Sequence, residues 1–216
     1  MRIADLNMTN PNHSCPRDFR TTTSPKRMCG RQNGPDCVST TFPVHGIQYQ
    51  NVCGRTIGYQ DNSPNAFAPY YDNRLITIDG TYLDGVSITH GHHPRKHIWS
   101  FAAALDEAGT TFPTTRCPCT RVNVLFPGVI PPFIGQDYFC DTGSRSTFED
   151  KIYSDDPLWD GHGCGAGSSC CRFNSPPWFC KQLPQPTSDD IELRLCADQS
   201  IGNEDVLIEL VELYVQ

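Results

Sequence analysis

Twelve cysteines constrain this chain of 216 residues more than any other feature of its sequence. They predict a disulfide-linked fold in an oxidising compartment, because disulfides persist outside the cytosol and are rare within it. The even count allows complete pairing, but so many cysteines leave the partners open. We therefore expect disulfide bonds, with no partners assigned, at Cys15, Cys29, Cys37, Cys53, Cys117, Cys119, Cys140, Cys164, Cys170, Cys171, Cys180 and Cys196.

The length and charge of the chain limit the fold class and the kinds of partner that it can have. A chain of this size can bury most of its apolar surface, so the disulfides reinforce a core and do not replace one. No internal repeat is visible, which predicts a single disulfide-rich β domain over residues 1–216. The net charge is −7 without long runs of Lys or Arg, which excludes a nucleic-acid surface. No apolar run is long enough to span a membrane.

Two glycosylation sequons support an extracellular location. Asn7-Met8-Thr9 and Asn12-His13-Ser14 are both N-x-S/T acceptors, so Asn7 and Asn12 are candidate glycan sites. The first residues lack the apolar segment of a secretory signal. Together with the cysteines, these features predict a secreted protein and a domain cut from a longer chain.

Alternating hydrophobicity and β-favouring composition predict three strands. Residues 82–90 alternate, residues 96–104 are rich in β-favouring side chains, and Gly91-His92-His93-Pro94 between them has turn chemistry, so the pair is expected to form a hairpin. Residues 190–196 alternate as well. This predicts a half-buried strand with its aliphatic residues inward and its charged residues outward.

The remaining segments are less regular. Residues 53–60 favour a strand with Gly58 as a bulge candidate. Residues 204–216 fit either a closing strand or an amphipathic helix capped by Asn203, and their β-branched and aromatic content favours the strand. Residues 10–65 are rich in Pro, Gly, Asn, Ser and Thr and are expected to form loops and short strands pinned by disulfides. Residues 105–182 are rich in Pro and Gly and are expected to form long loops tethered by disulfides. The expected fold is an all-β, disulfide-rich antiparallel β-sandwich with long tethered loops.

Two segments carry candidate metal ligands. Four histidines fall within residues 90–97, and neutral imidazoles at the strand ends, His90 and His97, suit Zn or Cu. The alternative is a polar hairpin tip. Asp155, Asp156 and Asp160 lie in an acidic loop of the kind that binds calcium, although their spacing is not that of an EF-hand. The alternative there is a carboxylate-rich turn without metal.

Aromatic residues near prolines provide candidate binding residues. Exposed Trp side chains stack on sugars or protein surfaces because they bury a large area at low entropic cost. Trp159 and Trp178 are the candidates, and the alternative is that such aromatics form a small core beneath a loop.

Catalytic motifs are scarce. The chain has no G-x-S-x-G elbow, and a cysteine nucleophile would require an unpaired thiol. No catalytic residue is assigned. A secreted hydrolase stays open as an alternative, with an acid/base pair among Asp84, Asp141, Asp155, Asp156 and Asp160.

Several segments together resemble an uncharacterised cysteine-rich module of secreted marine-invertebrate proteins, some of which are named uncharacterised skeletal organic matrix proteins. The similarity covers nearly the whole chain. It implies placement in the extracellular matrix or at the cell surface, and it assigns no catalytic or ligand residue. The segments that carry it are Asp5–Thr9, Val52–Arg55, Leu83–Gly91, Lys96–Ala103, Phe139–Gly143, Asp155–Gly161, Leu183–Thr187 and Asp189–Cys196.

The expected function is therefore that of a secreted matrix or cell-surface module with an adhesive or recognition role. Its partner is expected to be an extracellular protein or glycan, and calcium is the candidate cofactor. The secreted hydrolase is the alternative.

Overall fold

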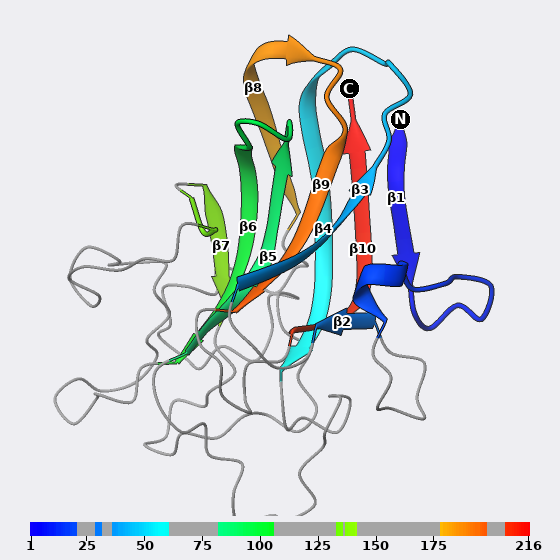
Figure 1. The fold of residues 1–216 in the computed structure, drawn as a ribbon, viewed down its shortest axis with the longest axis vertical. Coiled ribbons are helices and arrows are strands. Elements are labelled where there is room, and N and C mark those ends of the chain that lie inside the picture. The colour runs from blue at the N-terminus through cyan, green and yellow to red at the C-terminus, as the bar shows by residue number, and fades with distance from the viewer. Residues whose placement is uncertain are drawn as a thin grey trace, which may run out of the picture.

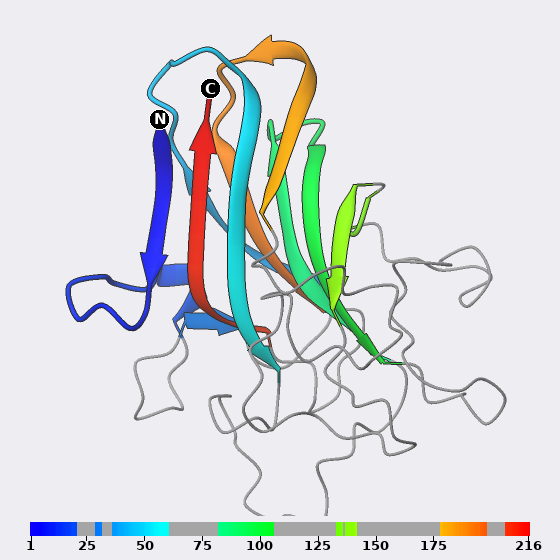
Figure 2. The same cartoon turned by 180° about the vertical axis from the view of Figure 1, so that it is seen from behind.

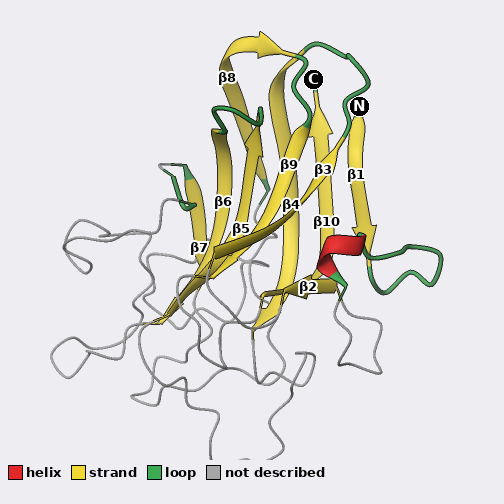
Figure 3. Cartoon of the chain, in the orientation of Figure 1, coloured by secondary structure: helices red, strands yellow, loops and turns green. Residues whose placement is uncertain are grey.

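Two β-sheets packed face to face make up the fold in the computed structural model (Figure 1). The structure describes residues 1–20, 29–31, 36–60, 82–105, 133–135, 137–141, 178–197 and 206–216. Among these residues the only helical element is the 3₁₀ turn η1 (Arg17–Phe19), and the rest is strand and loop (Figure 3). The expected all-β, disulfide-rich sandwich is confirmed.

The first sheet, sheet A, lies in front in Figure 2. All of its neighbouring strands are antiparallel. Its edge strand β8 contains two prolines, which cannot donate to a ladder and are tolerated at an edge. The strands follow the order β1 (Arg2–Asn7), β10 (Val206–Val215), β4 (Tyr49–Gln60) and β8 (Phe179–Thr187), and the short β2 (Cys29–Arg31) also pairs with β10.

The second sheet, sheet B, is antiparallel except for its last pair, β6 and β7, which is parallel. The strand order is β3 (Asp36–Phe42), β9 (Ile191–Ala197), β5 (Tyr82–His90), β6 (Lys96–Leu105) and β7 (Tyr138–Asp141). The β5–β6 hairpin agrees with the prediction. The expectation of loops throughout residues 105–182 is wrong at β7 and at the start of β8, because a four-residue strand and a proline-containing strand give no clear alternation.

The C-terminal segment is a strand and not a helix. Strand β10 lies between β1 and β4, so both of its edges are hydrogen-bonded. The ladder with β4 shifts register next to Gly58, as the sequence suggested, but the extra residue is Glu209 on β10. A bulge of this kind bends a strand and increases its twist.

Strand β9 is buried on both faces, which corrects the expectation of a half-buried strand. Ile191, Leu193 and Leu195 point into the core between the sheets. Glu192, expected to be exposed, has only 3% of its surface accessible. The hairpin residue Arg95 covers its carboxylate, so hydrogen bonding replaces solvent there.

Three disulfides lie within the described residues. Cys15–Cys29 ties the segment after β1 to β2. Cys37–Cys196 joins β3 to β9, and Cys53–Cys180 joins β4 to β8, each between residues directly opposite in the ladder. These two bonds link neighbouring strands, whereas the sequence suggested stapled loops. Cys140 lies on β7, and the other cysteines, Cys117, Cys119, Cys164, Cys170 and Cys171, fall outside the described residues.

Candidate functional site

An aromatic and charged cluster lies on the outer face of sheet A. It consists of Arg55 on β4, Glu212 and Tyr214 on β10, and Trp178 just before β8. Arg55 is directly opposite Glu212 in the β4–β10 ladder. Side chains on opposite residues of an antiparallel pair share a face, so the ladder itself brings these two together. We call these four residues the Trp178 cluster.

The indole of Trp178 is held in place and still open to solvent. The Arg55 guanidinium lies 5.2 Å from the centre of the Trp178 ring, a cation–π distance. Tyr214 packs on the same indole with the ring centres 5.9 Å apart. Trp178 nevertheless exposes 51% of its surface. Its orientation is therefore fixed before any ligand arrives, which reduces the entropic cost of binding.

The charges in the Trp178 cluster balance. Arg55 Nε donates a hydrogen bond of 2.5 Å to Glu212 Oε2. On the neighbouring strand β1, Arg2 and Asp5 form a second ion pair of 2.9 Å. These two ion pairs place hydrogen-bonding groups beside the exposed aromatic ring, with the charges of these four side chains paired.

The next residue explains why Trp178 faces outward. Successive residues of a strand point to opposite faces, and Phe179 points into the core. There Phe179 stacks on Trp99 of sheet B, with ring centres 5.4 Å apart, and meets Phe101 edge-on. The predicted binding residue Trp178 is thus on the surface. Its partners Arg55, Glu212 and Tyr214 were missed, because their proximity depends on strand pairing that the sequence does not reveal.

The two histidines predicted as metal ligands do not meet. His90 Nδ1 lies 2.9 Å from Asp189 Oδ2. His97 pairs with Thr89, the residue next to His90, and so lies on the opposite face of sheet B. No three His, Cys, Asp or Glu side chains surround a common point among the described residues. Asp155, Asp156, Asp160 and Trp159 fall outside them, so the calcium hypothesis stays a prediction.

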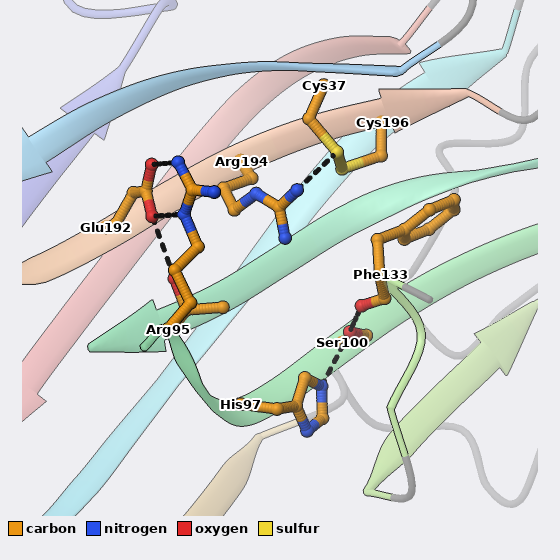
Figure 4. The surroundings of a disulfide bond; sticks show 9 residues. Cys37, Arg95, His97, Ser100, Phe133, Glu192, Arg194 and Cys196 are labelled. Atoms are coloured by element: carbon orange, nitrogen blue, oxygen red, sulfur yellow. Dashed lines mark hydrogen bonds and ion pairs between the residues drawn. A yellow bond between two sulfur atoms is a disulfide. The ribbon is translucent and has the colours of Figure 1, made fainter. Parts of the chain in front are cut away.

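His97 and Ser100 form a pair that superficially resembles a catalytic dyad (Figure 4). His97 Nε2 lies 2.9 Å from Ser100 Oγ, and the Ser100 hydroxyl donates to the carbonyl oxygen of Phe133 at 2.9 Å. Because the hydroxyl hydrogen is already donated to Phe133, the Ser100 oxygen accepts a hydrogen bond from His97 Nε2–H, and this protonated nitrogen cannot act as a base. Ser100 is also fully buried. The pair fastens the 133–135 segment to β6 and has no geometry for nucleophilic attack.

The fold also places two of the aspartates proposed for a hydrolase. Asp84 of β5 and Asp141 of β7 are both paired with Ala103 of β6, from its two sides. Two strand spacings separate their backbones by about 10 Å. The other candidates of that pair lie outside the described residues.

Both sequon asparagines are described. Asn7 ends β1, and its Oδ1 accepts hydrogen bonds from the backbone N–H and the hydroxyl of Thr9, at 3.0 and 2.6 Å. Asn12 lies in the following turn and is exposed.

No protein family, curated protein or solved structure matches this chain. The described residues contain no helix capable of crossing a lipid bilayer.

Proposed function

We propose that this chain is a secreted recognition module that binds an uncharged glycan through the Trp178 cluster. The observation that carries the proposal is the half-exposed indole of Trp178, which Arg55 and Tyr214 hold in a fixed orientation. A preformed aromatic surface of this kind can stack on the apolar face of a sugar ring. The three disulfides support the extracellular location.

The neighbouring charges favour an uncharged ligand. A surface for sulfated or sialylated glycans would carry unpaired cations, whereas Arg55 is neutralised by Glu212. The same two side chains can exchange hydrogen bonds with sugar hydroxyls at the edge of the indole. The resemblance to secreted skeletal organic matrix proteins supports placement in a matrix or at a cell surface, with Asn7 and Asn12 as glycosylated positions.

The test is a glycan array probed with protein secreted under oxidising conditions, with and without calcium. Binding to uncharged glycans that is lost in Trp178→Ala and weakened in Arg55→Ala would support the proposal. Ile47→Ala is the matched control, because Ile47 is an exposed apolar residue outside the Trp178 cluster. This variant should bind as the unaltered protein does.

Other results would overturn the proposal. Binding restricted to sulfated glycans, or binding that survives Trp178→Ala, would contradict it. Capture of a purified matrix protein without any glycan would point to a protein ligand. Release of shorter sugars from a bound glycan would favour the hydrolase, and Asp84→Asn and Asp141→Asn would then be the variants to measure. A requirement for calcium would direct attention to Asp155, Asp156 and Asp160.

A further inference from the structure

Two disulfides of this fold are matched in geometry. Cys37–Cys196 and Cys53–Cys180 each join directly opposite residues of neighbouring antiparallel strands, with Cα atoms 4.1 Å apart in both. Their sequence separations, 159 and 127 residues, are also similar. Chain entropy depends only weakly on such a difference in loop length, so it does not distinguish the two bonds.

Each disulfide has an arginine two residues away on one of its strands, and the two arginines differ in their partners. Arg55, near Cys53, is neutralised by Glu212. Arg194, near Cys196, lies on the same face as Glu192, but the Glu192 carboxylate already accepts hydrogen bonds from Arg95 Nε, Arg95 Nη2 and the Thr89 hydroxyl (Figure 4).

The Arg194 guanidinium instead contacts the disulfide. Its Nη2 donates to Cys37 Sγ at 3.1 Å. Burial lowers the pKa of Arg194, and the nearby charge of Arg95 lowers it further, while Glu192 acts in the opposite direction. The described residues offer Arg194 no hydrogen bond to a carboxylate. The half-buried Arg194 guanidinium thus contacts a neutral sulfur. A negative charge on that sulfur would stabilise the guanidinium.

We propose that Cys37–Cys196 is a redox-active disulfide, selectively reduced by a dithiol such as that of an extracellular thiol–disulfide oxidoreductase, whereas Cys53–Cys180 is structural. Reduction creates a thiolate at Cys37 directly beside the Arg194 guanidinium. A neighbouring cation lowers the pKa of a thiol and stabilises the reduced state, which makes a disulfide easier to reduce.

The exchange proceeds in two balanced steps. A thiolate of the dithiol attacks Cys37 Sγ, because Cys37 is partly exposed whereas Cys196 is fully buried. The Cys37–Cys196 bond breaks, a mixed disulfide forms at Cys37, and Cys196 leaves as a thiolate that takes up a proton. The second thiol of the dithiol then loses its proton, and the resulting thiolate attacks the other dithiol sulfur, the one bonded to Cys37 in the mixed disulfide. Cys37 leaves as a thiolate beside Arg194, and the dithiol becomes a disulfide, so two electrons reach the protein.

Reduction would release one strand of sheet B. Among the described strands, β3 pairs with β9 alone, and Cys37 lies near the beginning of β3. Cys196 belongs to a small apolar cluster on the outer face of sheet B with Ala102, Phe133 and Ile134. Opening the bond therefore frees the end of β3 beside this cluster, while sheet A stays linked through Cys53–Cys180.

The test is the equilibrium of each disulfide in buffers of reduced and oxidised dithiothreitol at pH 8, read by differential alkylation and mass spectrometry. We expect Cys37–Cys196 to be reduced at a lower ratio of reduced to oxidised dithiothreitol than Cys53–Cys180. Exposure alone predicts the opposite order, because Cys180 is exposed. In Arg194→Gln, the equilibrium constant for reducing Cys37–Cys196 should fall roughly tenfold, equivalent to about 30 mV for two electrons.

Arg55→Gln is the matched control and should leave the equilibrium of Cys53–Cys180 unchanged. Equal equilibrium constants for Cys37–Cys196 with and without Arg194, or reduction of Cys53–Cys180 first, would overturn the proposal. If Arg194→Gln did not fold, Arg194→Lys and the comparison of the two disulfides in the unaltered protein would decide the question.

Discussion

Trp178 and Phe179 are consecutive residues with opposite environments: the indole is 51% exposed on the outer face of sheet A, and the phenyl ring is 3% exposed between the sheets. The alternation of a β-strand produces this contrast directly. One residue therefore belongs to a surface that can meet a ligand, and the next belongs to the aromatic contact between the two sheets.

Alanine substitutions at these adjacent positions should separate binding from stability. Phe179→Ala removes the stacking on Trp99 and leaves a cavity, so it should lower the free energy of unfolding by about 3–5 kcal/mol. Trp178→Ala should lower it by no more than about 1 kcal/mol, because the indole is half in solvent. Urea unfolding without reductant measures both. Similar losses in the two variants would contradict the assignment of Trp178 to the surface.

The half-buried imidazole of His97 should make stability depend on pH in mildly acidic solution. Burial lowers the pKa of His97, Asp137 opposes this effect, and Lys181 and Arg194 add to it. The unfolded chain then binds a proton more readily than the folded one. The stabilising contribution is fully present above the unfolded pKa of about 6.5 and is lost as the pH falls through the folded value.

Melting temperatures measured from pH 8 to pH 5 test this dependence. His97→Gln can still donate to Ser100 but does not titrate, so the decline that begins near pH 6.5 should become shallower in this variant. An unchanged pH profile would show that His97 is not the group responsible.

Glu192 should contribute a second, more acidic dependence. Burial raises its pKa, but the hydrogen bonds from Arg95, Ser39 and Thr89 outweigh this effect, and the pKa is lowered overall. Its contribution is present above the unfolded pKa of about 4.3 and is lost as the pH falls through the folded value. In Glu192→Gln, urea midpoints between pH 5 and pH 2.5 should vary less than in the unaltered protein. Parallel curves for the two proteins would count against the prediction.

Glycan occupancy should follow the exposure of the sequons. Asn12 is exposed in a turn, whereas Asn7 is half-buried at the end of β1 and is already bonded to Thr9. Secretion from eukaryotic cells should therefore give higher occupancy at Asn12, measured by the mass change after enzymatic deglycosylation. Asn12→Gln should remove most of the glycan and Asn7→Gln little of it. The reverse pattern would contradict this order.

The sequence predicted those parts of the fold that depend on local pattern. The hairpin of β5 and β6 follows from alternation before a turn and β-favouring side chains after it, and β10 follows from β-branched and aromatic content. Strand β7 was missed because four residues carry no recognisable period. The burial of Glu192 was missed because it depends on Arg95, which is 97 residues distant in sequence.

Only one residue of the candidate site, Trp178, was predicted from the sequence. Trp178 stood out as an aromatic residue beside prolines, but Arg55 and Glu212 are 157 residues apart and meet only when β4 pairs with β10. The same holds for Arg194 and Cys37, also 157 residues apart. Strand register, which composition does not encode, brings each of these pairs together.

The pairing of the first and last strands has a mechanical consequence. Strands β1 and β10 are antiparallel neighbours, the Met1 amine donates to the Val215 carbonyl at 2.5 Å, and both ends of the chain lie at the same end of the sandwich (Figure 1). Tension applied between the two ends would load the β1–β10 hydrogen bonds one after another. In a shear geometry, by contrast, all of these bonds would be loaded together. Strand β1 should therefore peel away at low force. The peeling should stop at Cys15, because its bond to Cys29 transfers the load to β2.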